Sequence, residues 1–437
     1  MIVSGTEPAE GTLTTLDDLF RRAGVRRPDA LALIDPPNGE AITGSPPRRL
    51  TYAEADRAIS AFAARLRGLG LQTDAVVAIQ LGNTVDSVIA LLGVLRAHLI
   101  AAPLPLLWRQ QEMVAALSRV SAKAIVTSAR IGASTPAETA MQVAAELFPI
   151  RHIAGFGRGL PDGVAPLDNV FPAGPLEFFQ PPPRPGHAAA HVAAITFDVS
   201  TDGFVPVQRS HSELIAAGLA VAQQSGGAPD TTILSTIPLG SFAGIALTVL
   251  PWLLGGGRLA MHHGFDPAVF AEQCRAQHAA TVALPGPALT PLAAAGLLNA
   301  PIKNILALWR APEQLASAAP WTGSAALADI TSFDETALLP ARRGPDGLPT
   351  PVAHSAFAAP SGVIAVGGYR FRQSEIDAAV AAVDPAAVIV ALPDAYLGQR
   401  LAGRSRDGAA TAAELQACGV NSLIAGAFRP RARLNAA

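Results

Sequence analysis

The sequence predicts an α/β protein with a large N-terminal domain and a small α+β domain at its C-terminal end. Its 437 residues exceed the length of one ordinary domain, and half of them are apolar while 15% are charged, which favours large cores. Short apolar segments alternate with helical patterns along most of the chain. This alternation is typical of a parallel sheet that has helices on both faces.

The alternation forms two halves, separated by a Pro- and Gly-rich connection over residues 160–187. In the first half, an amphipathic helix precedes a strand at 30–34, and the remaining helices are predicted at 52–69 and 86–98, with strands at 76–80, 100–103 and 124–127. In the second half, strands are predicted at 192–197, 233–237, 258–261 and 280–283, and helices at 213–224, 244–254 and 267–277.

The last part of the chain has its own pattern after the loop-like stretch 340–362. A strand at 363–366, a helix at 375–383 and a strand at 387–392 indicate a small separate unit. The domains expected are therefore residues 1–355, with subdomains at about 12–170 and 188–340, and a C-terminal cap over residues 356–437.

Composition limits the possible partners. The net charge of −2 gives no indication of a nucleic-acid or anionic-membrane partner. Cys274 and Cys418 lie too far apart to suggest a metal site or a disulfide framework, so a reduced, cytoplasmic setting is expected. The N-terminus lacks the basic and apolar regions of a signal peptide. Only Lys123 and Lys303 are lysines, so any reaction that needs a lysine has two candidates.

The uncharged stretch 237–254 has the length of a short membrane span. It contains two prolines and two glycines, and three glycines follow it. A buried helix in an α/β core is therefore favoured over a membrane span.

Four blocks in this order resemble the adenylate-forming (AMP-binding) superfamily of acyl-CoA synthetases, aryl-CoA ligases and peptide-synthetase adenylation domains. They are 50–70, 75–107, 233–261 and 362–380, and the resemblance runs from about residue 14 to about residue 403. It implies two layered α/β sheets as in acyl-CoA synthetases, with a shortened third subdomain because residues 338–362 are a brief connection. The implied reaction activates a carboxylic acid with ATP and Mg²⁺ and passes it to the thiol of CoA or a carrier protein.

The family's phosphate loop resembles the segment that follows the strand Ile195–Phe197. Ser200, Thr201 and Gly203 stand at matching places and are implied nucleotide contacts. Asp198 and Asp202 add negative charge there, and no lysine follows. Carboxylates repel a triphosphate unless a metal intervenes, so a weakened nucleotide loop and a plain strand–turn–helix are both open interpretations.

Two further blocks supply candidate site residues. In the Pro-Leu block, Ser241 and Gly244 are implied contacts of the acyl pocket, although Ser241 is also a good helix cap. Trp309-Arg310-Ala311-Pro312 resembles the adenine-binding turn; Ala311 and Pro312 match it, whereas Arg310 replaces a glycine and suggests a filled pocket.

The magnesium block resembles residues 333–337. Phe333 and Thr336 match, and Asp334 or Glu335 is available as a carboxylate for Mg²⁺. The resemblance implies catalytic roles for Thr336 and Glu335, a nucleotide contact for Phe333 and Asp334, and Mg²⁺ binding by Glu335.

Three groups that the family uses are absent here. The ribose-binding Asp and the hinge Asp have no counterpart, and no lysine follows Lys303. Arg429, Arg431 or Arg433 would have to replace the C-terminal lysine, with a different donor geometry. Loss of such a charge costs ~10²–10³-fold in rate.

Two hypotheses follow. The first is an impaired ligase for a hydrophobic carboxylic acid. The second is an inactive relative that acts as an acyl-binding or regulatory subunit of a partner enzyme. A ligase requires Ser200, Thr201, Asp334 and Glu335 to converge on one cleft, whereas an inactive relative should have that cleft filled by Arg310, Trp309 or the acidic loop.

Overall fold

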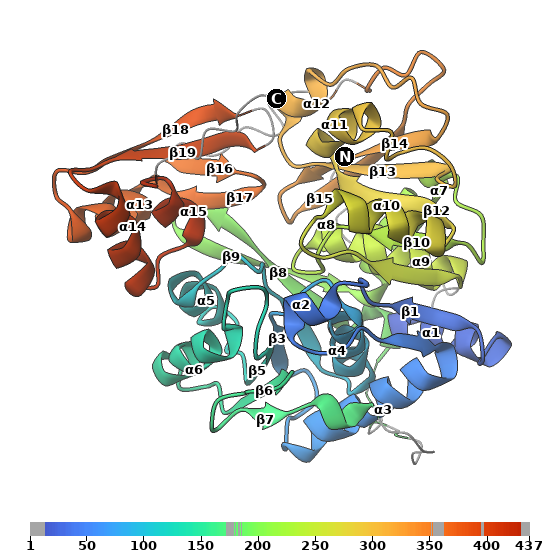
Figure 1. Cartoon of the computed structure of the whole chain (residues 1–437). Coiled ribbons are helices and arrows are strands. Elements are labelled where there is room, and N and C mark those ends of the chain that lie inside the picture. Colours follow the sequence, from blue (N-terminus) through green and yellow to red (C-terminus); the bar gives the residue numbers. More distant parts are fainter. Residues whose placement is uncertain are drawn as a thin grey trace.

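The computed structural model of the chain describes residues 14–171, 179, 181, 184, 186–350, 352, 362–394 and 397–429. Within these residues it contains two large sheets and a small C-terminal domain, with helices packed between and around the sheets (Figure 1). The α/β fold class predicted from the sequence is confirmed.

The first large sheet has seven strands within the described residues, in the order β7-β6-β5-β3-β4-β8-β9. All neighbours are parallel except β8 and β9, which form an antiparallel hairpin. The strands are β3 (Val76–Ile79), β4 (Ile100–Pro103), β5 (Ala124–Ser128), β6 (His152–Phe156), β7 (Ala165–Pro166), β8 (Val192–Ser200) and β9 (Gly203–Ser210).

The second large sheet has eight strands within the described residues, in the order β15-β14-β13-β12-β10-β11-β1-β2, parallel except at its two edges. The strands are β1 (Leu31–Ile34), β2 (Arg49–Thr51), β10 (Thr232–Ser235), β11 (Arg258–Met261), β12 (Ala279–Pro285), β13 (Asn304–Trp309), β14 (Ala326–Phe333) and β15 (Ala337–Arg342). The sheets exchange strands relative to the chain, because β1 and β2 join the second sheet while β8 and β9 complete the first. β1 and β2 lie in the expected subdomain 12–170 but join the second sheet, and β8 and β9 lie in the expected subdomain 188–340 but join the first.

The helices of the N-terminal part begin largely where the sequence provides capping residues. Thr15, Thr51 and Ser210 each form a capping box with an acidic residue three positions later. The helices are α1 (Leu16–Arg26), α2 (Gly39–Thr43), α3 (Tyr52–Gly68), α4 (Val85–Arg96), α5 (Gln110–Leu117), α6 (Pro136–Glu146), α7 (His211–Ser225), α8 (Phe242–Gly244), α9 (Leu250–Gly255), α10 (Pro267–Ala276), α11 (Leu289–Ala294) and α12 (Pro312–Ala316).

The uncharged stretch 237–254 forms α8, a π-helical turn (Ile245–Val249) and most of α9 (Leu250–Gly255), and all but two residues of these three elements are buried in the core. Among the described residues, no helix has the length and apolar character that crossing a membrane requires. The prediction of a buried helix is confirmed.

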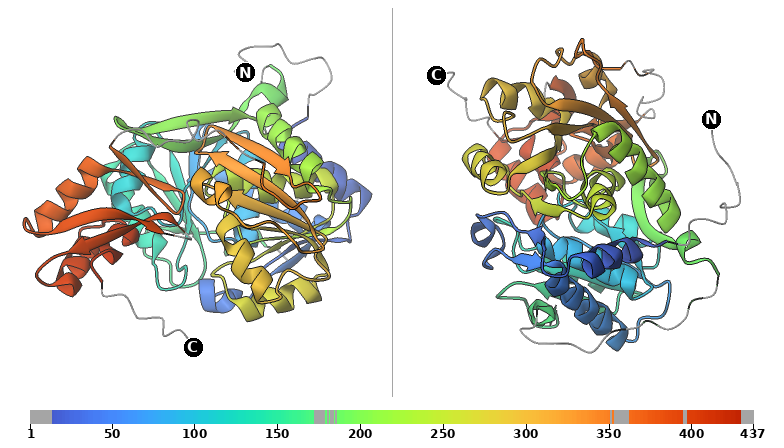
Figure 2. Two further views of the ribbon diagram at one scale, coloured as in Figure 1. Left: turned by 90° about the horizontal axis from the view of Figure 1, so that it is seen from above. Right: turned by 90° about the vertical axis from the view of Figure 1, so that its right-hand side faces the viewer.

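The C-terminal domain has a hydrophobic core of its own. It stands beside α5 and the β8–β9 hairpin, away from α1 and α3 (Figures 1 and 2). Its elements are β16 (Val363–Val366), β17 (Tyr369–Arg372), α13 (Gln373–Val383), β18 (Val388–Asp394), β19 (Gly398–Arg404), α14 (Gly408–Ala417) and α15 (Ser422–Gly426).

Helix α4 is the centre of the main core, since every one of its residues is buried. A helix that is buried on all sides must satisfy its polar groups inside the protein. At its N-terminal end, Asp35 accepts hydrogen bonds from the backbone N–H groups of Val85 (2.7 Å) and Arg48 (2.8 Å). Asn83 donates to the carbonyl groups of Ser235 and His262, which ties this end to the second sheet.

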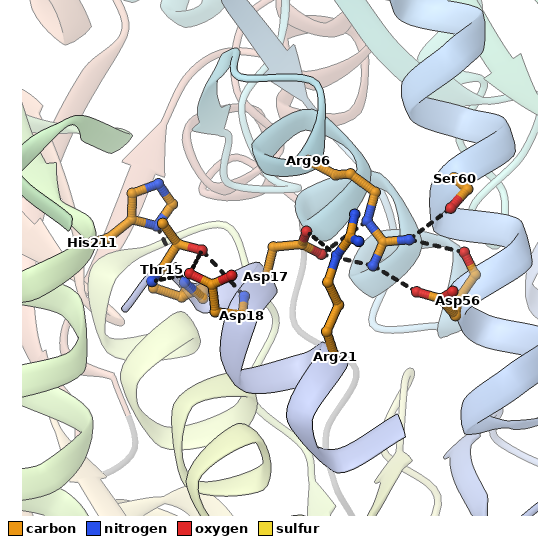
Figure 3. Close-up of polar contacts among 9 residues, drawn as sticks. Thr15, Asp17, Asp18, Arg21, Asp56, Ser60, Arg96 and His211 are labelled. Atoms are coloured by element: carbon orange, nitrogen blue, oxygen red, sulfur yellow. Dashed lines mark hydrogen bonds and ion pairs between the residues drawn. The ribbon is translucent and has the colours of Figure 1, made fainter. Parts of the chain in front are cut away.

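The C-terminal end of α4 carries a buried charge, the guanidinium of Arg96 (Figure 3). Arg96 forms ion pairs of 2.7 Å with Asp17 of α1 and with Asp56 of α3, and it donates to the Ser60 hydroxyl (2.8 Å). Three helices are thereby joined through one side chain. His98, in the turn that follows α4, adopts a left-handed φ of 56°.

We expect Asp17→Asn to lower the free energy of unfolding by about 3 kcal/mol, because it removes a carboxylate from a buried ion pair and leaves the Arg96 charge poorly compensated. Asp56→Asn is the matched control. The Asp56 side chain is 40% exposed against 13% for Asp17, so its loss should cost less than about 1 kcal/mol. Urea denaturation of the three proteins measures both values, and equal losses would contradict this role for Asp17.

Candidate active site

A cavity where the two sheets meet the C-terminal domain is lined by several of the residues singled out from the sequence, among them Ser241, Arg310, Asp334 and Glu335. Its volume is about 70 Å³. It lies at the ends of β8, β10, β13 and β14, under the turn between β16 and β17. Its walls are Pro105, Leu106, Trp108, Phe197, Asp198, Val199, Pro238, Gly240, Ser241, Arg310, Asp334, Glu335, Gly368, Tyr369 and Arg370.

Arg310 is the residue that the resemblance aligns with a glycine of the adenine-binding turn. It follows β13, and its guanidinium donates to the Ser241 hydroxyl (2.9 Å). Its aliphatic stem lies directly beneath Gly368, because a Cβ atom built on Gly368 would be 2.0 Å from the Arg310 Cδ atom. Gly367 and Gly368 both have positive φ and form the two-residue turn from β16 to β17. The C-terminal domain therefore covers Arg310 with a residue that has no side chain.

Asp334 and Arg370 join the two domains across the cavity. The Nε atom of Arg370 lies 2.6 Å from Asp334 Oδ1. Asp334 begins the turn between β14 and β15 and has a φ of 51°, a conformation that Asp adopts more readily than most residues. Burial raises the pKa of the Asp334 carboxyl to about 6, against the opposing effect of Arg370.

Glu335 lies next in the same turn and is held by the backbone of α8. Its Oε2 atom accepts a hydrogen bond of 2.6 Å from the N–H of Phe242. Arg209 of β9 donates to the carbonyl groups of Glu335 and Thr336 and lies 3.6 Å above the Phe242 ring. Burial raises the pKa of Glu335 to about 7, with Arg310 the main opposing influence.

These contacts bear on the expected Mg²⁺ site. Asp334 is paired with Arg370, and Glu335 accepts from Phe242, so protein donors already bind both carboxylates. Among the described residues, no group of three or more His, Cys, Asp or Glu side chains is arranged to hold a metal ion. Mg²⁺ is commonly held by one or two carboxylates together with substrate phosphates, and in this arrangement both candidate carboxylates would have to exchange a protein partner for the ion.

The segment that resembles the phosphate loop is a tight hairpin turn. β8 continues to Ser200 and β9 begins at Gly203, which leaves Thr201 and Asp202 as the turn. The Ser200 hydroxyl donates to the Gly203 carbonyl (3.1 Å) and accepts from the N–H of Asp202 (3.1 Å). The Ser200 hydroxyl therefore makes its hydrogen bonds within the turn. The sequence interpretation of a strand–turn–helix is corrected in one respect: the segment is a strand–turn–strand hairpin, and Ser200 rather than an Asp caps the turn.

Two arginines from other elements hold the tip of this hairpin. Arg119, which follows α5, donates to the Asp202 carbonyl (3.3 Å), and Arg372 of the C-terminal domain donates to the Thr201 carbonyl (3.4 Å). The hairpin therefore bridges the first sheet and the C-terminal domain.

The remaining predicted site residues have the following positions. Ser241 lines the cavity and caps α8 by accepting from the Gly244 N–H (3.1 Å). Gly244 packs so closely that a Cβ atom would be 2.0 Å from the Pro238 carbonyl oxygen. Thr336 is exposed, and its hydroxyl donates to the Phe333 carbonyl within the turn (2.7 Å).

Ala311 lies outside the cavity, beneath Gly398 of the C-terminal domain, and Pro312 begins α12. Trp309 packs in a hydrophobic cluster of the second large sheet, where its indole N–H donates to Asp329 (2.7 Å). Of Trp309 and Arg310, only Arg310 lines the cavity. Of the C-terminal arginines, Arg429 donates to Gln416 on α14 (2.8 Å), while Arg431 and Arg433 lie outside the described residues.

The structure thus brings together Ser241, Asp334, Glu335 and Arg310, and it keeps the Ser200–Gly203 turn and Thr336 out of the cavity wall. The sequence interpretation missed Arg370, Tyr369 and Arg209. The adjacent glycines Gly367 and Gly368 were a usable signal for Tyr369 and Arg370. Two adjacent glycines between apolar segments favour a hairpin turn, and the residues that follow such a turn lie at its end.

Comparison with known proteins identifies the family and agrees with the fold. The family model described as AMP-binding enzyme matches residues 20–328. The 2-hydroxy-7-methoxy-5-methyl-1-naphthoate–CoA ligase of Streptomyces carzinostaticus is 29% identical over 271 residues, which are 59% of this chain and 46% of that protein. The chain spans less than half of the length of the curated relatives that it matches.

Two solved structures show the likeness of fold over nearly the whole chain. The artificially fused adenylation–PCP di-domain NpsA-ThdA of Klebsiella oxytoca has a TM-score of 0.66 at 15% identity and covers 98% of this chain and 95% of that one. The apo structure of MbtA from Mycobacterium smegmatis has a TM-score of 0.61 at 20% identity, with 94% and 89% covered.

We expect Gly368→Ala to lower the free energy of unfolding by about 2–3 kcal/mol, because its φ of 83° disfavours a side chain and the new methyl group would overlap Arg310. In an Arg310→Ala background the same change should cost only ~1 kcal/mol, the part due to φ. A double-mutant cycle by denaturation measures the difference, and additive losses would show that the two residues do not pack together.

We expect Glu335 to stabilise the fold less as the pH rises from 4.5 to about 7. Its folded pKa is raised from an ordinary 4.5, so the native state keeps the proton through this window while the unfolded chain releases it. The effect amounts to at most about 3 kcal/mol. The free energy of unfolding, measured by denaturation across this pH range, should vary less with pH in Glu335→Gln than in the wild type. Glu54→Gln is a control at a carboxyl whose pKa is shifted in the opposite direction, because hydrogen bonds from Thr51 lower the pKa of Glu54. An unchanged profile for Glu335→Gln would contradict the raised pKa.

Proposed function

Because the chain belongs to the AMP-binding enzyme family, we propose that it is a member that binds a hydrophobic carboxylic acid without activating it by ATP. It would act as an acyl-binding or regulatory subunit of a partner enzyme. The observation that carries this proposal is the size of the central cavity. At about 70 Å³ it is well below the ~300–1,000 Å³ of ordinary ligand pockets.

The filling of the cavity comes from this chain's own side chains. Arg310 extends into the position that glycine keeps open in the family, and its contact with Ser241 holds it there. Gly368 closes over it from the C-terminal domain. A nucleotide would have to displace both contacts.

The charges around the cavity also oppose a polyphosphate. Asp198, Asp334 and Glu335 line it together with Arg310 and Arg370. Burial raises the pKa of each of the three carboxyls, which reflects the cost of placing negative charge there. ATP would add several negative charges to the same low-dielectric space.

A hydrophobic acid is supported as the ligand class by the Streptomyces relative, whose name specifies an aromatic acid. A cytoplasmic setting, in which Cys274 and Cys418 stay reduced, belongs to the same proposal.

The second candidate function is an impaired ligase that uses ATP, Mg²⁺ and either CoA or a carrier-protein thiol. It is favoured by one observation, since Asp334 and Glu335 lie at the same cavity as Ser241, as the resemblance implies for a site that joins metal and acyl group. Rotation of the C-terminal domain would have to break the Asp334–Arg370 contact before such a site could form.

We expect no detectable heat of binding when the purified protein is titrated with ATP and Mg²⁺ up to 1 mM, roughly the upper end of ordinary substrate KM values. The same titration with an adenylating relative provides the positive control. Acid-dependent exchange of pyrophosphate into ATP is the second measurement. Micromolar ATP binding together with exchange would overturn the proposal and establish the ligase.

A further inference from the structure

A second cavity, larger than the first, lies between the C-terminal domain and the β8–β9 hairpin. Its volume is about 300 Å³. Its apolar wall comes from both domains, with Phe204 of β9 on one side and Phe371, Ile376, Val420 and Ile424 on the other. Phe204 belongs to the core of the first sheet, while the other four belong to the separate C-terminal core. The cavity is therefore an unfilled gap between two hydrophobic cores.

The charged groups at this cavity are mostly committed to protein partners. Glu112 accepts from the Arg109 N–H (2.9 Å) at the start of α5, and Glu375 is paired with Arg372. Gln111 donates to the Cys418 carbonyl (3.2 Å), a contact that closes one side of the gap between the domains. Burial raises the pKa of the Glu112 carboxyl.

Arg370 is the one basic residue among the described residues that line this cavity. Together with Val199 it also lines the first cavity, so it stands at the boundary between the two. The closest contact of Arg370 to Asp334 is made by its Nε atom. A guanidinium also has two NH₂ groups, which can bind a carboxylate in a bidentate manner.

From this arrangement we propose that the second cavity binds a medium-chain carboxylate, with its alkyl chain between Phe204 and the C-terminal core and its carboxylate on Arg370. A volume at the lower end of the range for ligand pockets favours a medium rather than a long chain. The inference deepens the proposed function, because it locates the acyl-binding site at the domain interface. The inference rests on the proposed function, in which the acid binds without ATP.

The position of this site has a mechanical consequence. A ligand in the cavity contacts both domains, so its binding energy adds to the contacts that keep the C-terminal domain in place. Asn421 donates to the Leu107 carbonyl (2.8 Å) on the same side of the interface, and that contact would be strengthened when the gap is filled.

Calorimetric titration of the full chain with decanoate, in the absence of ATP, tests the proposal. Ala115 of α5 lines the cavity and is half-buried, so Ala115→Trp should fill the space and weaken decanoate binding at least 10-fold. Ala294→Trp, at an exposed alanine of α11, is the matched control and should bind as the wild type does. Circular dichroism of both variants verifies that they are folded.

The head group is tested by comparing decanoate with decanol. Arg370→Gln should remove the preference for decanoate, whereas Asp334→Asn, which breaks the same ion pair but keeps the guanidinium, should preserve or increase it. A wild-type affinity in Ala115→Trp would overturn the location. Tighter binding of decyltrimethylammonium than of decanoate would overturn the carboxylate assignment. ATP-dependent turnover would overturn the proposed function alone, since decanoate binding at this cavity is measured without ATP.

Discussion

The buried guanidinium of Arg96 is the contact on which the packing of the main core depends. A charge without accessible surface must be matched by carboxylates, and Asp17 and Asp56 bring α1 and α3 to the end of α4 for that reason. Since α4 is buried along its whole length, fixing its ends fixes the layer between the two sheets. The strand ends that border the candidate site are positioned from this layer.

The site lies where strand ends meet, as is usual for open parallel sheets. β10 leads to the loop before Ser241, β13 leads to Arg310, and β14 leads to Asp334 and Glu335. The same architecture that supports ligase chemistry elsewhere is retained, while the side chains at the strand ends neutralise one another. The site keeps the location that the fold provides, with a cavity of about 70 Å³. A scaffold tolerates different side chains at its strand ends because its stability rests on the core.

Much of the fold could be predicted because local sequence patterns mark its helices and strands. β4, β11 and β16 have the predicted bounds, and α3 and α4 differ by one or two residues, since capping residues and apolar runs mark their limits. The exchange of β1 and β8 between sheets depends on long-range pairing, which no local pattern encodes. The Ser200–Gly203 segment formed a hairpin because β9 was available as a partner. Arg370 reaches the site from a different domain, and the direction in which Arg310 points depends on the missing side chain of Gly368.

The separate core of the C-terminal domain has a consequence for local stability. Its hydrophobic cluster is separate from the clusters of the two sheets, although Val363 of β16 packs into the core of the first sheet. Its other described ties include a few hydrogen bonds, one ion pair and the packing of Gly368 on Arg310. Proteins open in cooperative units that follow such divisions. Amide hydrogens of α13 to α15 should therefore exchange with solvent as a group, at a lower free energy than those of α4, and the domain can detach and reattach while the main core remains intact.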